Sequence, residues 1–195
     1  MKYRLGVTPS QTVGPYFSMR LAAEGQNVLV TPDTIGDRVR IQGHVLDGDR
    51  KPIEDALLEL WQANDAGRYN HPEDDRGDVA LDPAFIGFGR CATGFGDGSY
   101  AFLTIMPGSV PAPDGGRQAP HLNIVIQARG MLNPTYTRVY FPEEAAANAM
   151  DPVLRSVPAE RRATLIAELI DDDALPTYRF DIRYQGADET AFFDV

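Results

Sequence analysis

The sequence predicts a mainly β protein, an antiparallel β-sandwich with long loops and two short helices. Apolar and polar residues alternate in segments that recur at short spacing along most of the chain, and such a period of two is typical of half-buried strands. Helical patterns are confined to two short stretches, and both come late in the chain. Closely spaced strands with helices inserted late favour a β-sandwich.

Strand signals occur in seven segments, most of them bounded by turn residues. Residues 38–47 alternate apolar and polar side chains and then enter an Asp-Gly-Asp turn. In residues 177–186, Tyr178, Phe180 and Ile182 share one face, opposite charged neighbours, which is typical of antiparallel strands with one face buried. The complete set of predicted strands is 38–47, 56–64, 99–108, 120–130, 135–141, 177–186 and 190–195.

The two helical stretches are residues 141–149 and 157–170. Each has a proline at a position suited to the first turn, Pro142 and Pro158. In the second stretch, Leu165, Ile166, Leu169 and Ile170 form an apolar stripe. Residues 65–98 are rich in Gly, Asp and Pro with little periodicity, which predicts one long loop.

Composition excludes several classes of partner. The chain has 195 residues, 18 Lys and Arg, 28 Asp and Glu, and a net charge of −10, so nucleic acid is not an expected partner. No apolar run is long enough to span a membrane, and the first residues lack the apolar core of a secretory signal. The single cysteine, Cys91, rules out an internal disulfide framework. We therefore expect a cytoplasmic protein of one sandwich domain.

The residues alone leave the chemistry open. In APHLNIVIQARG (119–130), His121 and Asn123 are two positions apart on a predicted strand and so share a face. That spacing suits two metal ligands, but an amide is a poor ligand for a transition metal. Tyr69, in a loop that also contains His71, is a further oxygen donor. A metal strand, a failed metal strand and a plain core strand all remain possible readings.

Longer segments carry a family resemblance. TPSQTVGPYF (8–17) resembles the N-terminal signature of intradiol ring-cleavage dioxygenases. Further similar segments follow in the order of that family and cover nearly the whole chain: GHVLDGDRKPIEDALLELWQANDAGRYNH (43–71), LDPAFIGFGRCAT (81–93), GSYAFLTIMPG (98–108), APHLNIVIQARG (119–130), TRVYF (137–141) and YRFDIRYQGADETAFFDV (178–195).

The resemblance implies a ferric site that is incomplete here. Catalytic members of the family use two Tyr and two His ligands. The matching positions are Tyr69, Val110, His121 and Asn123, so one phenol and one imidazole survive. Valine has no donor atom and the amide is weak, so we expect this chain to bind no iron and to hold these four positions as vestiges.

The departure from the catalytic pattern resembles a non-catalytic alpha subunit. The resemblance then implies a homologous beta subunit that carries the non-haem ferric iron, a higher alpha-beta oligomer, and 3,4-dihydroxybenzoate as the substrate at a shared pocket. We expect residues 1–35 to form an arm that contacts the partner, and residues 36–195 to form the sandwich domain. None of this chain's residues is expected to be catalytic.

By the same resemblance, five residues border the substrate pocket. They are Thr12, Gly14, Pro15, Tyr16 and Arg129. The planar Arg129 cation suits an aromatic carboxylate, although it could equally pair with an acid of the partner. Two other readings stay open: a self-sufficient iron dioxygenase that uses Tyr69 and His121, and a β-sandwich binding module without enzymatic activity.

Overall fold

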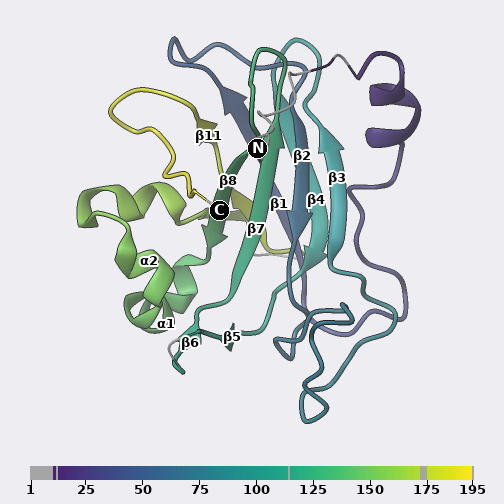
Figure 1. The fold of residues 1–195 in the computed structure, drawn as a ribbon, viewed down its shortest axis with the longest axis vertical. Helices are drawn as coiled ribbons and strands as arrows, with labels where there is room; N and C mark the ends of the chain where they lie inside the picture. Colours follow the sequence, from purple (N-terminus) through teal and green to yellow (C-terminus); the bar gives the residue numbers. More distant parts are fainter. Residues whose placement is uncertain (1–10, 12, 114, 172–174, 195) are drawn as a thin grey trace, which may run out of the picture.

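The fold is a sandwich of two β-sheets with a helical segment at one side (Figure 1). The structure is a computed structural model, and it describes residues 11, 13–113, 115–171 and 175–194. Within them, no helix is long and apolar enough to cross a membrane. The predicted fold class, mainly β with long loops and short helices, is confirmed.

The first sheet is antiparallel throughout and contains two of the four predicted ligand positions, His121 and Asn123. Its four strands lie side by side in the order β3 (Phe88–Ala92), β2 (Leu57–Trp61), β7 (His121–Gln127) and β8 (Thr135–Tyr140), so that β3 and β8 are the edge strands of this sheet. Along β7, Leu122, Ile124 and Ile126 point into the core and are fully buried. The alternate residues, among them Asn123, therefore face away from the core.

The second sheet is built around one long strand and is mixed, whereas the sequence predicted antiparallel pairing. The strands are β1 (Arg38–Leu46), β4 (Ser99–Ile105), β9 (Glu168–Asp171), β10 (Thr177–Arg179) and β11 (Ile182–Arg183). β1 pairs with β4 in antiparallel fashion and with β10 and β11 in parallel. Gly43 of β1 lies against the Phe180 carbonyl, where a Cβ atom has no room.

Apolar side chains from both sheets meet in one core. The inward residues of β1 interdigitate with those of β7, and the predicted alternation of Tyr178, Phe180 and Ile182 is confirmed because all three are buried. The Tyr100 hydroxyl crosses the core side of the second sheet and donates to the Phe180 carbonyl at 2.5 Å. Burial of this apolar surface is the main stabilising contribution of the sandwich.

The helical region differs in detail from its prediction. It contains η2 (Pro142–Glu144), α1 (Ala145–Met150), α2 (Pro152–Ser156) and η3 (Ala159–Leu165). Asp151 starts α2, and its carboxylate accepts hydrogen bonds from the backbone N–H groups of Val153 and Leu154. The predicted helix 157–170 is wrong in its second half, since Leu169 and Ile170 belong to strand β9.

Two further predictions about strands were wrong. The segment 65–98 contains strand β3, whose half-exposed residues hide the alternation that a sequence pattern needs. Residues 190–194 form no named strand and make only a bridge between Phe193 and Tyr136. Two very short strands, β5 (Val110–Pro111) and β6 (Arg117–Gln118), pair with each other below the main sheets (Figure 1).

The described part of the predicted arm has two different halves. Its first half includes the helical turn η1 (Phe17–Leu21), none of whose residues is buried. Its second half is tied to the sandwich: Leu29 joins the core, and the Leu29 N–H donates to the Leu103 carbonyl of β4 at 2.9 Å. Among the described residues of the predicted arm, those near Leu29 therefore pack on the sandwich, whereas η1 contributes no buried residue.

Candidate functional site

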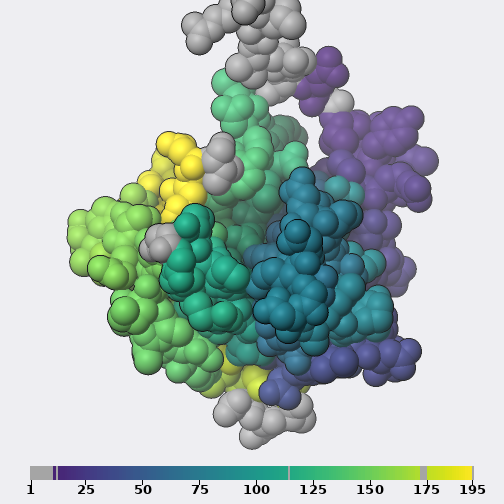
Figure 2. Space-filling view, turned by 60° about the horizontal axis from the view of Figure 1, so that its bottom comes forward, coloured from purple at the N-terminus to yellow at the C-terminus, as the bar shows by residue number. Residues whose placement is uncertain are grey.

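The four positions predicted to be vestigial ligands gather at the end of the sandwich where β7 begins. Tyr69 comes from the loop after β2, Val110 begins β5, and both line a cavity of about 500 Å³. Asn123 hydrogen-bonds to Tyr69, and His121 precedes it on the same face of β7. Figure 2 brings this end forward and shows the loop 65–87, in blue, beside the β5–β6 segment, in green. The structure thus brings the four predicted positions into one region.

Tyr69 is fixed in position by its neighbours, and its hydroxyl is protonated. Its ring stacks on Trp61 with 5.6 Å between centroids, and its N–H donates to Asp74 Oδ2 at 2.8 Å. Burial raises the pKa of the Tyr69 hydroxyl, although the Arg138 cation and the hydrogen bond to Asn123 oppose that shift. At neutral pH this side chain is therefore a protonated phenol, which is a weaker metal ligand than a phenolate.

Val110 and Asn123 supply no metal ligand. Val110 is buried and has no atom with a lone pair to donate. The Asn123 amide nitrogen donates to the Trp61 carbonyl at 3.2 Å, so this side chain is occupied by protein contacts. Their roles are structural: one fills space beside the cavity and the other ties β7 to β2 and to Tyr69.

His121 is neutral and buried. Only 3% of its surface is exposed, and its Nδ1 lies 2.7 Å from the Ala119 carbonyl. Burial, together with the nearby Arg138 cation, lowers the pKa of His121 to about 4, against the opposing effects of the Ala119 carbonyl and the Asp151 carboxylate. The imidazole therefore satisfies a backbone carbonyl and is buried beside Tyr140, on the face of β7 that points away from the sandwich core.

These residues do not fit a ferric ion. They offer one neutral imidazole and one protonated phenol, and the other two positions offer nothing suitable. Nor does any group of three or more His, Cys, Asp or Glu residues come together elsewhere in the described part of the chain. A hard trivalent cation needs anionic oxygen donors; Glu73, Asp74 and Asp75 line this cavity, but among the described residues they form no group that could hold a metal ion.

Two residues of this region were missed by the sequence reasoning, Arg138 and Gln118. Both line the same cavity, and Arg138 Nη1 donates to Gln118 Oε1 at 2.6 Å. Arg138 is directly opposite Asn123 in the β7–β8 register. The sequence analysis attached no role to Arg138, because only strand register reveals which residue it meets.

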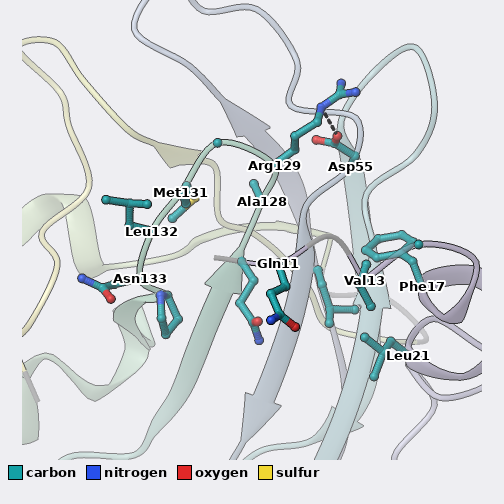
Figure 3. Close-up of a pocket in the computed structure, with 15 residues that line it drawn as sticks. Gln11, Val13, Phe17, Leu21, Asp55, Ala128, Arg129, Met131, Leu132 and Asn133 are labelled. Atoms are coloured by element: carbon teal, nitrogen blue, oxygen red, sulfur yellow. Dashed lines mark ion pairs between the residues drawn. The ribbon is translucent and has the colours of Figure 1, made fainter. Parts of the chain in front are cut away.

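A second candidate region lies at the other end of β7. A groove of about 560 Å³ separates the arm from the loop that joins β7 to β8. Figure 3 shows Val13 and Phe17 of the arm on one side and Met131 and Leu132 of the loop on the other. At about 3.3 Å per residue, the eight positions from His121 to Arg129 place this groove roughly 25 Å from the vestigial site.

The structure brings Gly14 and Arg129 to this groove. Gly14 has φ +60°, a conformation that favours glycine. Arg129 stands at the rim with 89% of its side chain exposed, and its Nε lies 2.9 Å from Asp55 Oδ2 (Figure 3). Pro15 and Tyr16 are exposed beside the groove, with Tyr16 65% exposed. Thr12 lies outside the described residues.

Comparison with known proteins identifies the class to which the fold and the vestigial site belong. A family model described as "Dioxygenase" matches residues 12–186. The dioxygenase domain of a carbohydrate-binding fusion protein from Streptomyces sp. SirexAA-E has a similar structure, with a TM-score of 0.59 and 27% identity, and the match covers 94% of this chain and 99% of that one. The chain belongs to the intradiol dioxygenase family.

Two relatives show which subunit of one enzyme the chain resembles more. The chain is 44% identical over 200 residues to the protocatechuate 3,4-dioxygenase alpha chain of Burkholderia cepacia, and the match covers 96% of this chain and 97% of that one. It is 36% identical over 172 residues to the beta chain of the same enzyme, a match that covers 85% of this chain and 72% of the beta chain. The similarity to the alpha chain is thus both higher and more complete.

Proposed function

We propose that this chain is the non-catalytic alpha subunit of a protocatechuate 3,4-dioxygenase. The observation that carries the proposal is the loss of two ligand positions, Val110 and Asn123, in a chain that otherwise keeps the family fold. The nearly full-length similarity to an alpha chain supports it. The partner in this proposal is a homologous beta subunit, which carries the ferric iron, and the two assemble into a higher alpha-beta oligomer.

The reaction of the complete enzyme follows from this assignment. Protocatechuate, which is 3,4-dihydroxybenzoate, and one O₂ molecule give 3-carboxy-cis,cis-muconate. The bond between the two hydroxyl-bearing carbons breaks, and both oxygen atoms enter the product. The cytoplasm is the proposed location, because a single half-buried cysteine suits a reducing compartment.

The arm is proposed to wall the partner's active site. Thr12, Gly14, Pro15 and Tyr16 border the substrate in this proposal, and residues 1–35 contact the beta subunit. The exposure of Tyr16 and the absence of buried residues in η1 support it, because the arm's apolar side chains are left to be covered by something else. A rigid aromatic ring beside an ordered glycine turn is well suited to such a wall.

Arg129 is proposed to bind the carboxylate of the substrate and thereby to select substrates that carry one. The Asp55 carboxylate, which pairs with Arg129 in the structure, competes with the substrate for this cation. In the assembled enzyme, Arg129→Ala should raise KM for protocatechuate by about tenfold, the size of one charge-assisted hydrogen bond. Catechol, which lacks the carboxylate, is the control substrate and should be affected little. An unchanged kcat/KM for protocatechuate would remove Arg129 from this role, and Asp55→Asn tests whether the internal ion pair restrains it.

Colour and association together distinguish the three readings of this chain. Ferric iron bound by a tyrosinate absorbs visible light. We expect the chain purified alone to be colourless and inactive, and to form an active coloured complex with its beta partner. A coloured, active lone chain would instead support the self-sufficient enzyme with Tyr69 and His121. A colourless chain that never binds a beta subunit would support the non-enzymatic binding module.

A further inference from the structure

Two turns place large apolar side chains in solvent at the end of the sandwich where β7 ends. Ala92 of β3, Leu57 of β2 and Gln127 of β7 lie side by side in register, so the turns that follow β3 and β7 leave the sheet at the same end (Figure 1). These turns carry Phe95 and Leu132. With 95% and 81% of their surface exposed, they are the two most exposed large apolar side chains among the described residues.

The β3–β4 turn holds Phe95 on a fixed backbone. The Gly94 N–H donates to the Ser99 carbonyl at 2.7 Å, and the Gly98 N–H donates to the Gly94 carbonyl at 3.0 Å. Asp97 Oδ1 accepts from the Ser99 N–H at 2.9 Å. Gly98 has φ +65°, a conformation that favours glycine. The turn is therefore closed by its own hydrogen bonds, which lowers the entropy that a partner must remove on binding Phe95.

This turn adjoins the groove beside the arm. The Thr93 N–H donates to the Ala56 carbonyl at 2.9 Å, and the sequence neighbours of Ala56, Asp55 and Leu57, line the groove. Phe95 comes two residues after Thr93 and so lies within roughly 7 Å of it. Phe95 therefore lies on the same surface as the groove and the arm.

Other apolar residues extend this surface. Val13 and Leu132 line the groove, and Tyr16 and Met19 of the arm are 65% and 67% exposed. A single exposed leucine is ordinary in a soluble protein, whereas a cluster of large apolar side chains marks a site of association. Aromatic residues and methionine are also enriched at protein interfaces. We call these residues the apolar end surface: Val13, Tyr16, Met19, Phe95 and Leu132.

Two observations indicate which protein covers the apolar end surface. The relatives at 44% and 36% identity are the alpha chain and the beta chain of one enzyme, which supports pairing with a beta subunit. The surface is also continuous with the groove that Arg129 borders, where the beta subunit is proposed to lie. A second copy of this chain is disfavoured, because two molecules that each carry a net charge of −10 repel each other.

We propose that the apolar end surface binds the beta subunit, with Phe95 as the aromatic anchor that fills an apolar pocket of that subunit. The inference rests on the proposed function and deepens it, because the contact with the partner then extends from the arm to the β3–β4 turn. In this arrangement Phe95 contributes affinity between the subunits, whereas Arg129 contributes selection of the substrate.

The test measures the dissociation constant between the full-length chain and the iron-bearing beta subunit by isothermal titration calorimetry. Phe95→Ala should raise Kd at least about thirtyfold, the usual effect of truncating an aromatic anchor at the centre of an interface. Phe95→Leu keeps most of the apolar volume and should raise Kd less. Leu132→Ala, in the adjacent turn, should raise Kd by about fivefold, because a smaller apolar area is lost.

A matched control truncates an exposed apolar side chain elsewhere. Met150 lies at the end of α1 and is 69% exposed, so Met150→Ala should change Kd by less than about twofold. Thermal unfolding checks that each variant is folded. Because Phe95 is exposed, Phe95→Ala should unfold at the same temperature as the unmodified chain, which separates lost binding from lost stability.

Three outcomes distinguish this inference from the proposed function. If the unmodified chain and Phe95→Ala bind the beta subunit equally tightly, or if Met150→Ala weakens binding as much, the inference is wrong and the proposed function stands. A lone chain that sediments as a dimer, and as a monomer after Phe95→Ala, would also overturn the inference, because the surface would then bind a second copy. An unmodified chain that never binds the beta subunit would refute the proposed function, and this inference with it.

Discussion

His121 should make the folded chain sensitive to mild acid. Its pKa is lowered to about 4 by burial, whereas an unfolded histidine titrates near 6.5. Between these two values the unfolded chain binds a proton that the native chain does not. The contribution of His121 to the free energy of unfolding is therefore fully present above pH 6.5. It falls as the pH drops toward 4 and no longer changes below pH 4.

The magnitude follows from the two pKa values. Their difference corresponds to about 3 kcal/mol of unfolding free energy, of which about 2 kcal/mol is already lost at pH 5. A loss of that size is a substantial part of the stability of an ordinary domain. Because the imidazole is almost fully buried, screening by solvent reduces the effect little.

The assay is urea unfolding, followed by circular dichroism, at a series of pH values from 7.5 to 4.5. His121→Gln keeps a side chain that can donate to the Ala119 carbonyl and removes the titration. Other titrating groups affect both proteins, so the difference between the two pH curves isolates His121. His44→Gln, which removes an exposed histidine on β1, is the matched control.

One result would refute this reasoning. If the wild type and His121→Gln lose the same stability between pH 7.5 and 5, the imidazole either becomes protonated in the native state or is hydrated. The site would then be more open than the structure shows, and the account of His121 as a neutral buried residue would be wrong.

Three more predictions concern stability and can be measured by the same unfolding assay. Asp151→Ala should cost about 3 kcal/mol, because this fully buried carboxylate accepts four hydrogen bonds; Asp151→Asn should cost less, and an equal cost would contradict the capping role. Gly43→Ala should cost about 3 kcal/mol through overpacking against the Phe180 carbonyl, whereas Gly77→Ala, where a Cβ meets nothing, should be nearly neutral. Asp74→Asn should cost about 2 kcal/mol at pH 7, because the hydrogen bond from Arg76 lowers the Asp74 pKa to about 2; that cost should fall as the pH drops from about 4 to 2, and a pH-independent cost would contradict it.

Predictions of the fold succeeded where one face of an element is buried. The strand at 38–46 alternates strictly because it lies between core and solvent, and the strand at 121–127 alternates from Leu122 onward. The prediction failed for β3, whose residues are mostly half-exposed, and for β9, where an apolar run fits a helix stripe as well as a strand. Local pattern cannot separate these cases, because pairing with a distant strand decides between them.

The ligand positions of the candidate site were accessible from sequence, but their surroundings were not. The resemblance identified Tyr69, Val110, His121 and Asn123, and the structure shows them in one region. Gln118 lies outside the quoted segments, and Arg138 lies in TRVYF, to which the sequence analysis attached no site role. Their contact spans 20 residues and depends on the pairing of β7 with β8.

By itself, the sequence determined the fold class, the family resemblance and the loss of two ligands, since a valine has no donor atom in any conformation. Only the tertiary structure decided which side chains surround the four predicted ligand positions and which residue Arg129 meets. A cation opposite Asn123 and an ion pair with Asp55 are both products of long-range packing. Chemistry that depends on which atoms a residue possesses can be read from the chain. Chemistry that depends on which charges meet requires the fold, because electrostatic energies fall off with distance through space and not along the sequence.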